Sequence, residues 1–416
     1  RGFEAIRRRV LAADPRHGAL YATLAERAAR QRRYADAARL AAEGVALDPT
    51  SWRSHAVRGI NQLRLGFPDS ARASLEAAFE GDPFDLWTKN TLDLLDATAG
   101  YRTVRTAHVD VVADSSEAAL LALYVGPLLE DAWERMAARY AYRPPTRVRL
   151  ELYQRHADFS VRSVGLTGHG ALGVSFGPVL AMDSPAAREA GEFHWGSTAW
   201  HELAHTFTLG ASNDRVPRWL TEGLSVLEER RARPGWGDGP TPRWLAAWKA
   251  GRVPPPSRLN DGFVRPAYPE QVVHAYYTAS LLCEMLERDG GAGATVALLA
   301  AYRDGASTPD ALRRALRLAP EELDRRFDAY VRERFATALS AVDERGGALA
   351  AVMARGDSLA EAGQTAPAIA AFETARALFP EWATGESPYW RLAQLHRARG
   401  DDARAAGARV TTGGAR

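Results

Sequence analysis

The feature that most constrains the fold of this chain is the stretch His201-Glu-Leu-Ala-His205. Two histidines spaced i, i+4 on a helix lie on the same face, so their imidazoles can bind one divalent metal ion. Glu202, which lies between them, is placed to accept a proton from a water at that ion. The apolar residues around the motif recur at helical spacing and are Trp200, Leu203, Ala204 and Phe207. The pattern therefore predicts a buried helix that contributes two ligands to a metal site.

A catalytic zinc ion takes three protein ligands, so the two histidines need a third group. Residues 209–214 are turn formers that end the first helix, and residues 217–229 predict a second helix with proline in its first turn. Glu222 is the best candidate, because it lies among apolar residues where a carboxylate needs a partner. Glu228 and Glu229 are weaker candidates, since they fall at a charged helix end that is more simply solvated. The three donor atoms should then lie within about 4 Å of one another.

The two segments together resemble a known family. HELAH followed by PRWLTEGLSVLEE is similar to the gluzincin metallopeptidases, specifically the bacterial peptidase MA-like domains. The resemblance implies one zinc ion per chain, held by His201, His205 and Glu222. It also implies hydrolysis of peptide bonds by a metal-activated water, with Glu202 as the general base. No acidic residue is assigned to hold a substrate's amino terminus, which favours an endopeptidase.

The resemblance extends over residues 102–340 and implies a small sheet beside the metal-binding helices. The expected elements are a strand over 103–112, a helix over 117–142, a strand over 146–153 and a hairpin over 171–182. In the family the edge strand of such a hairpin binds substrate in extended form. An ordinary edge strand is the alternative.

A later helix, over 274–286, is similar to the one on which these domains carry a tyrosine near the metal. Tyr276 or Tyr277 could donate a hydrogen bond to the oxyanion that develops during hydrolysis, and core packing is the alternative for each. The family's better-known members have an aspartate four residues after the third ligand, where this chain has Val226. Asn213 or Asp214 could orient a histidine instead, although capping of the turn is the simpler interpretation.

Both ends of the chain contain an internal repeat. At a shift of 34 residues, Ala37, Gly44 and Pro49 recur as Ala71, Ala78 and Pro83. The same template recurs near the other end at Gly363, Ala368, Phe372, Ala375 and Pro380, and a further copy begins at Tyr389. This period and these small residues resemble tetratricopeptide repeats, with two units in front and about one and a half behind. Arrays this short are expected to pack on the central domain or on each other, and their concave faces offer either a docking surface for a protein partner or a mere scaffold.

These observations predict a mostly helical α+β chain. We expect tetratricopeptide repeat helices over 1–98, a gluzincin-type peptidase domain with a small sheet and a helical zinc-binding core over 99–340, and C-terminal repeat helices over 341–416. The alternative function is a catalytically inactive peptidase-like scaffold that uses the repeats for protein–protein interaction.

The composition sets further bounds on function. A formal net charge of +2 over 416 residues indicates neither nucleic acid nor an anionic membrane as a partner. No apolar run is long enough to predict a membrane span. Lys89 and Lys249 are the only lysines, and this preference for arginine is typical of GC-rich bacterial coding. The chain begins at Arg1 without a methionine, which leaves both a cytoplasmic and an exported location open.

Overall fold

The computed structural model describes residues 2–168, 170–189, 193–343 and 347–411. The described chain is mostly helical, with one five-stranded sheet, which confirms the predicted α+β class. It divides into two compact units, Arg1–Arg215 and Val216–Arg416.

The first unit begins with helical hairpins that follow the predicted repeat. The two helices of the first hairpin start at residues 18 and 34, and those of the second hairpin start 34 residues later, at 52 and 68. One further helix starts at residue 86, where the first helix of a third hairpin would begin. The bounds are α1 (Gly2–Ala13), α2 (Gly18–Arg30), α3 (Tyr34–Leu47), α4 (Trp52–Arg64), α5 (Pro68–Gly81) and α6 (Leu86–Ala97).

Small residues let these helices cross closely, as the sequence pattern predicted. A Cβ atom placed on Gly44 of α3 would lie 2.7 Å from Ser54 Oγ of α4 and 3.1 Å from the Gly18 carbonyl oxygen of α2. The equivalent position of the next hairpin, Ala78, is also buried. A larger side chain at either position would separate the helices.

The sheet has the strand order β1-β2-β3-β5-β4. Its strands are β1 (Arg102–Arg105), β2 (Val109–Ala113), β3 (Val148–Tyr153), β4 (Gly173–Ser175) and β5 (Val179–Asp183). The central pairs are parallel, whereas β1 with β2 and β4 with β5 are antiparallel. The hairpin predicted over 171–182 is confirmed, and its first strand, β4, is an edge. The single strand predicted over 103–112 is wrong, because the Thr106 N–H donates to the Val109 carbonyl and turns the chain between β1 and β2.

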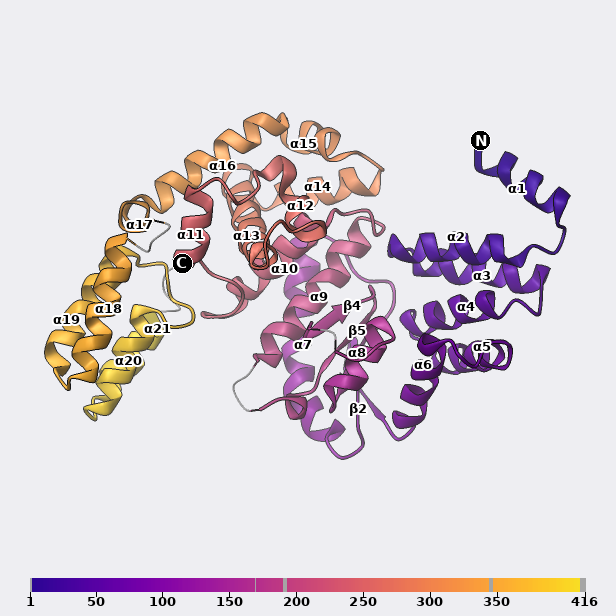
Figure 1. Ribbon diagram of the computed structural model, residues 1–416, viewed down its shortest axis with the longest axis horizontal. Helices are drawn as coiled ribbons and strands as arrows, with labels where there is room; N and C mark the ends of the chain where they lie inside the picture. Colours follow the sequence, from indigo (N-terminus) through magenta and orange to yellow (C-terminus); the bar gives the residue numbers. More distant parts are fainter. Residues whose placement is uncertain (1, 169, 190–192, 344–346, 412–416) are drawn as a thin grey trace. The chain divides into compact units, whose positions relative to one another are not determined.

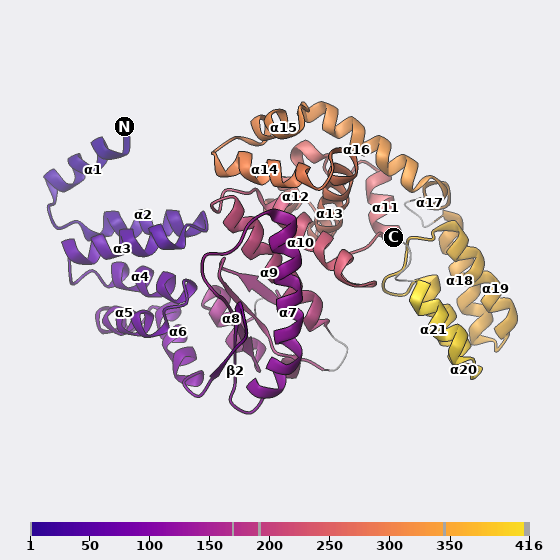
Figure 2. The ribbon, with the colours of Figure 1, turned by 180° about the vertical axis from the view of Figure 1, so that it is seen from behind.

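Helices cover both faces of the sheet (Figures 1 and 2). The helices α7 (Ala118–Tyr140) and α9 (Trp195–Ala211) pack on one face, and α8 (His156–Val164), which the sequence did not predict, packs on the other. The N-terminal hairpins also contact this second face, where the Tyr34 ring lies 5.8 Å from the ring of Phe176, in the turn between β4 and β5. The N-terminal hairpins therefore pack on the sheet, which is one of the two arrangements expected for so short an array.

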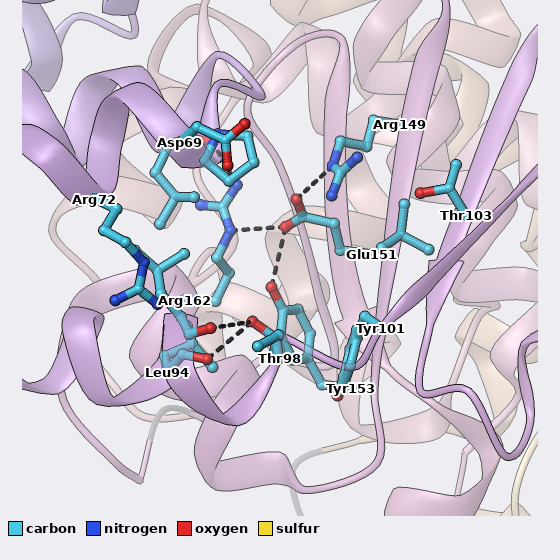
Figure 3. Close-up of a pocket in the computed structure, with 15 residues that line it drawn as sticks. Asp69, Arg72, Leu94, Thr98, Tyr101, Thr103, Arg149, Glu151, Tyr153 and Arg162 are labelled. Carbon is cyan, nitrogen blue, oxygen red and sulfur yellow. Dashed lines mark hydrogen bonds and ion pairs between the residues drawn. The ribbon is translucent and has the colours of Figure 1, made fainter.

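A buried ionic network joins the hairpins to the sheet (Figure 3). Glu151 of β3 accepts hydrogen bonds from Arg162 Nε at 2.7 Å, from Arg149 Nε at 2.8 Å and from the Tyr153 hydroxyl at 3.1 Å. Arg162 also donates to the Leu63 carbonyl oxygen at the end of α4. Burial raises the pKa of Glu151, but the two guanidinium groups lower it further, so the carboxylate stays ionised. These side chains line a cavity of about 360 Å³ whose buried charges are paired.

The second unit is entirely helical within its described residues. Its helices are α10 (Arg218–Ala232), α11 (Pro242–Lys249), α12 (Leu259–Val264), α13 (Gln271–Gly290), α14 (Gly293–Arg303), α15 (Thr308–Leu316), α16 (Pro320–Arg334) and α17 (Ala336–Ala341), followed by α18 (Gly347–Glu361), α19 (Thr365–Leu378), α20 (Pro388–Ala398) and α21 (Asp402–Thr411). A Cβ atom on Gly223 of α10 would lie 2.6 Å from the Ala279 carbonyl oxygen of α13, so these two helices cross at close range. The last four helices form two packed pairs that carry the C-terminal repeat pattern.

Candidate metal centre

Helix α9 carries the two histidines and begins and ends as its sequence predicts. The His194 ring accepts a hydrogen bond from the Ser197 N–H at the start of the helix. At the other end, Asn213 and Asp214 adopt positive φ angles of 50° and 59°, and the Asp214 N–H donates to the Leu209 carbonyl. Asparagine and aspartate tolerate this left-handed conformation better than other side chains do. Both residues therefore terminate the helix, as the simpler interpretation of this turn predicted.

The structure brings the two histidines and Glu222 together. His201, His205 and Glu222 each offer one ligand atom, and these atoms all lie within 4.8 Å of one another. The two imidazole rings are 4.9 Å apart at an angle of 77°. His205 and Glu222 are buried, and His201 is partly exposed. Two imidazoles and a carboxylate are a donor set that can hold a metal ion.

The bound of 4.8 Å on the distances between the ligand atoms is slightly wider than the expected separation of about 4 Å. Glu222 Oε1 accepts a hydrogen bond from Arg218 Nε, one turn earlier on α10, at 3.1 Å. Burial lowers the pKa of the Arg218 guanidinium, but Glu222 and Tyr276 raise it further, so this cation compensates the buried carboxylate. The sequence reasoning missed Arg218, although its position four residues before Glu222 is the signal for such a pair.

The two candidate tyrosines of α13 have different surroundings. The Tyr276 hydroxyl accepts a hydrogen bond from Arg218, the residue that pairs with Glu222. Tyr277 is buried, and its ring packs edge-on against Trp244 with 4.8 Å between centroids. Its hydroxyl has no hydrogen-bond partner among the residues that the structure describes, and burial raises its pKa well above the ordinary value. Tyr276 is thus associated with Glu222, whereas Tyr277 lies in the helical core.

The carboxylate of Glu202 lies against the edge strand of the sheet. A Cβ atom on Gly173 of β4 would be 2.6 Å from Glu202 Oε1 and 2.9 Å from Thr198 Cγ2, so only glycine leaves this position of the strand open to the carboxylate. Glu202 itself is buried on α9. Sequence reasoning expected a glycine-containing hairpin here, but it did not pair Gly173 with Glu202.

The remaining acidic candidates lie elsewhere. Glu228 and Glu229 are buried, so the expectation of a solvated helix end is wrong. The reason is that the arginines of this helix end pair with acidic side chains of α13: Arg230 Nη2 lies 2.8 Å from Glu284, and Arg231 Nη2 lies 2.5 Å from Glu287. Neither glutamate belongs to the group that could hold a metal ion.

In the described part of the chain, no helix combines the length and the apolar character that crossing a membrane requires. No model of a protein family matches the sequence, and comparison with curated proteins gives no match.

Proposed function

We propose that the chain is a zinc-dependent metallopeptidase. The observation that carries the proposal is the convergence of His201, His205 and Glu222, with Glu202 on the same helix as the two histidines. Two imidazoles and one carboxylate are the protein ligands of many catalytic zinc sites, which leave a further position for water. The resemblance of the two helices to gluzincin peptidases supports the same assignment.

Each side chain then has a chemical role. When bound, the zinc ion supplies Lewis-acid chemistry that makes water nucleophilic at neutral pH and polarises a carbonyl group. Glu202 accepts the proton of the attacking water and passes it to the leaving amine. Tyr276, held by Arg218, donates a hydrogen bond to the developing oxyanion. Tyr277 is not assigned this role, because its surroundings are those of a core residue.

The edge strand β4 supports a peptide as the substrate. An extended segment that adds to this edge receives main-chain hydrogen bonds that do not depend on its side chains. Gly173 keeps the strand open next to Glu202, so a bound backbone can lie close to the general base. This arrangement favours cleavage within extended segments and broad sequence tolerance, as in an endopeptidase.

The decisive test compares the parent chain with Glu202→Gln. The variant should retain one zinc ion per chain, measured by elemental analysis, and should cleave none of the peptides that the parent cuts. Glu134→Gln, which changes an exposed glutamate of α7, is the matched control and should behave as the parent. His205→Ala should lose the zinc ion. A parent chain that binds no zinc, or a Glu202→Gln variant with unchanged turnover, would contradict the proposal.

The second candidate is an inactive peptidase-like scaffold, and one observation favours it. Arg218 already pairs with Glu222, so a metal ion has to compete with the guanidinium for this carboxylate. A parent chain that binds zinc substoichiometrically and cleaves nothing in a broad peptide library would identify the scaffold.

A further inference from the structure

The cavity between the N-terminal hairpins and the sheet is not used by the proposed hydrolysis. Its volume is about 360 Å³, and its lining comes from α4, α5 and α6 on the side of the hairpins and from β1, β2, β3 and α8 on the side of the sheet (Figure 3). All of these elements belong to the first compact unit. No residue of the candidate metal centre lines the cavity. A cavity of this size can enclose a small molecule.

Five charged side chains line the cavity, and three of them together leave one positive charge in excess. Arg149 and Arg162 share the single carboxylate of Glu151. The Arg162 side chain is 2% exposed and also donates to the Leu63 carbonyl oxygen. Arg149 is more accessible, and within the described part of the chain its two terminal nitrogens, Nη1 and Nη2, have no hydrogen-bond partner. Two such guanidinium nitrogens match the two oxygens of a carboxylate.

The other two charged side chains of the cavity are Arg72 and Asp69. Arg72 is paired, because its terminal nitrogens lie 2.7 Å from Asp96 Oδ1 and 3.6 Å from Glu76 Oε1. Asp69 is exposed in the first turn of α5, and its carboxylate forms no ion pair or hydrogen bond with any residue that the structure describes. The cavity therefore offers one carboxylate and one guanidinium that are not paired with each other. A ligand that carries both signs of charge can satisfy both groups.

Most of the remaining lining is apolar. Its aliphatic part consists of Leu63, Leu94, Leu95, Ala99 and Val112. Leu94 and Val112 are each 4% exposed. The hydroxyl of Thr98, which also lines the cavity, already donates to the Leu94 carbonyl oxygen within its own helix end. These walls can bury an aliphatic side chain of a ligand.

We infer that this cavity binds a free α-amino acid with an aliphatic side chain, whose carboxylate contacts Arg149 and whose ammonium group contacts Asp69. An α-amino acid joins a carboxylate, an ammonium group and a side chain at one carbon atom, so it presents all three within a small volume. Asp69 belongs to α5 of the hairpins and Arg149 to β3 of the sheet, so the ligand strengthens the packing of the hairpins on the sheet. The inference stands independently of peptide hydrolysis, because it uses no residue of the candidate metal centre.

The test measures binding of three small probes to the full chain by calorimetry. L-Leucine carries both charges, L-leucinamide lacks the carboxylate, and N-acetyl-L-leucine lacks the ammonium group. Leucine should bind at least about tenfold more tightly than either derivative, the size expected for the loss of one charge-assisted hydrogen-bonded contact. Leucine should also raise the midpoint of thermal unfolding, because it binds the folded chain. The dipeptide Leu-Leu, tested on the Glu202→Gln chain so that it is not cut, has its two charges farther apart and should bind more weakly than leucine.

Variants connect these preferences to the cavity. Arg149→Met should abolish the difference between leucine and leucinamide, whereas Arg102→Met, which changes an exposed arginine of β1 outside the cavity, should keep it. Asp69→Asn should abolish the difference between leucine and N-acetyl-leucine, whereas Glu80→Gln, on the same helix but outside the cavity, should keep it. Asp69 is exposed and makes no ion pair among the described residues, so Asp69→Asn should fold as the parent does.

A further variant separates this cavity from the candidate metal centre. His205→Ala should bind leucine as tightly as the parent, even though it should lose the zinc ion. Loss of leucine binding in His205→Ala would place the amino acid at the metal centre and overturn the inference. Equal affinity of the parent for leucine and its two derivatives, no binding of leucine up to about 1 mM, unchanged preferences in Arg149→Met and Asp69→Asn, or tighter binding of Leu-Leu than of leucine would also overturn it.

Discussion

Replacing Gly173 with alanine tests whether the edge strand positions the proposed general base. The new Cβ atom would lie 2.6 Å from Glu202 Oε1, whereas ordinary van der Waals contact begins at 3.4 Å, so the carboxylate has to move by at least about 0.8 Å. A misplacement of about 1 Å at a catalytic group costs roughly 10²-fold in rate. We therefore expect kcat/KM for peptide cleavage to fall about 10²-fold, equivalent to about 2.7 kcal/mol of transition-state stabilisation.

Stability should change little in this variant. The atoms that must move all belong to side chains, namely Oε1 and Cγ of Glu202 and Cγ2 of Thr198, and Gly173 does not have a positive φ angle, so alanine fits the backbone. The free energy of unfolding should stay within about 1 kcal/mol of the parent value, and zinc should remain at one ion per chain. Gly170→Ala is the matched control, because a Cβ atom there meets nothing within 4 Å. A Gly173→Ala variant that is folded, zinc-loaded and as active as the parent would refute the reasoning.

The remaining predictions concern stability. Arg218→Met should lower the free energy of unfolding of the metal-free protein by about 1–2 kcal/mol. This value is smaller than for a fully buried ion pair because solvent screens Arg218, whose side chain is 42% exposed. Zinc should remove most of this loss of stability, because the ion then compensates the charge of Glu222. In chemical denaturation, Arg162→Met should lower the free energy of unfolding by about 3–5 kcal/mol, and Arg149→Met by only about 1 kcal/mol. The reason is that the Arg162 side chain is 2% exposed, whereas that of Arg149 is 28% exposed. Equal effects would contradict the argument that burial makes the pair with Glu151 costly to break. Burial raises the pKa of Asp214 from 3.8 to about 6, although Arg32 lowers it, so stability is lost as the pH rises through this range. Asp214→Asn should therefore raise the free energy of unfolding by about 1–2 kcal/mol near neutral pH. Below pH 3.8 it should leave this free energy unchanged, as unfolding measured over a range of pH would show.

Much of the local structure could be predicted because it depends on spacing along the chain. The 34-residue shift predicted repeated helical hairpins, and the structure has them, with helices that start at residues 18, 34, 52 and 68. The turn formers predicted where α9 ends. The predictions that failed concern contacts between distant segments. The strand over 103–112 is broken by a turn, and the charged end of α10 is buried because α13 supplies acidic partners for its arginines. Neither partner is visible from the pattern of one segment.

In the candidate site, too, the features that depend on local spacing could be predicted and the contacts between distant segments could not. The i, i+4 spacing of His201 and His205 and the apolar surroundings of Glu222 were sufficient to nominate three ligands, because helical geometry decides which side chains share a face. Only the tertiary structure associates Tyr276 with Arg218 and places Tyr277 against Trp244.

The sequence by itself determined the helical repeats, the mostly helical class and the residues that could hold a metal ion. The tertiary structure decided that Gly173 lies against Glu202 and that Arg218 pairs with both Glu222 and Tyr276. The physical reason is that periodicity specifies the face on which a side chain lies, whereas its electrostatic and steric partners come from segments that meet only when the chain packs.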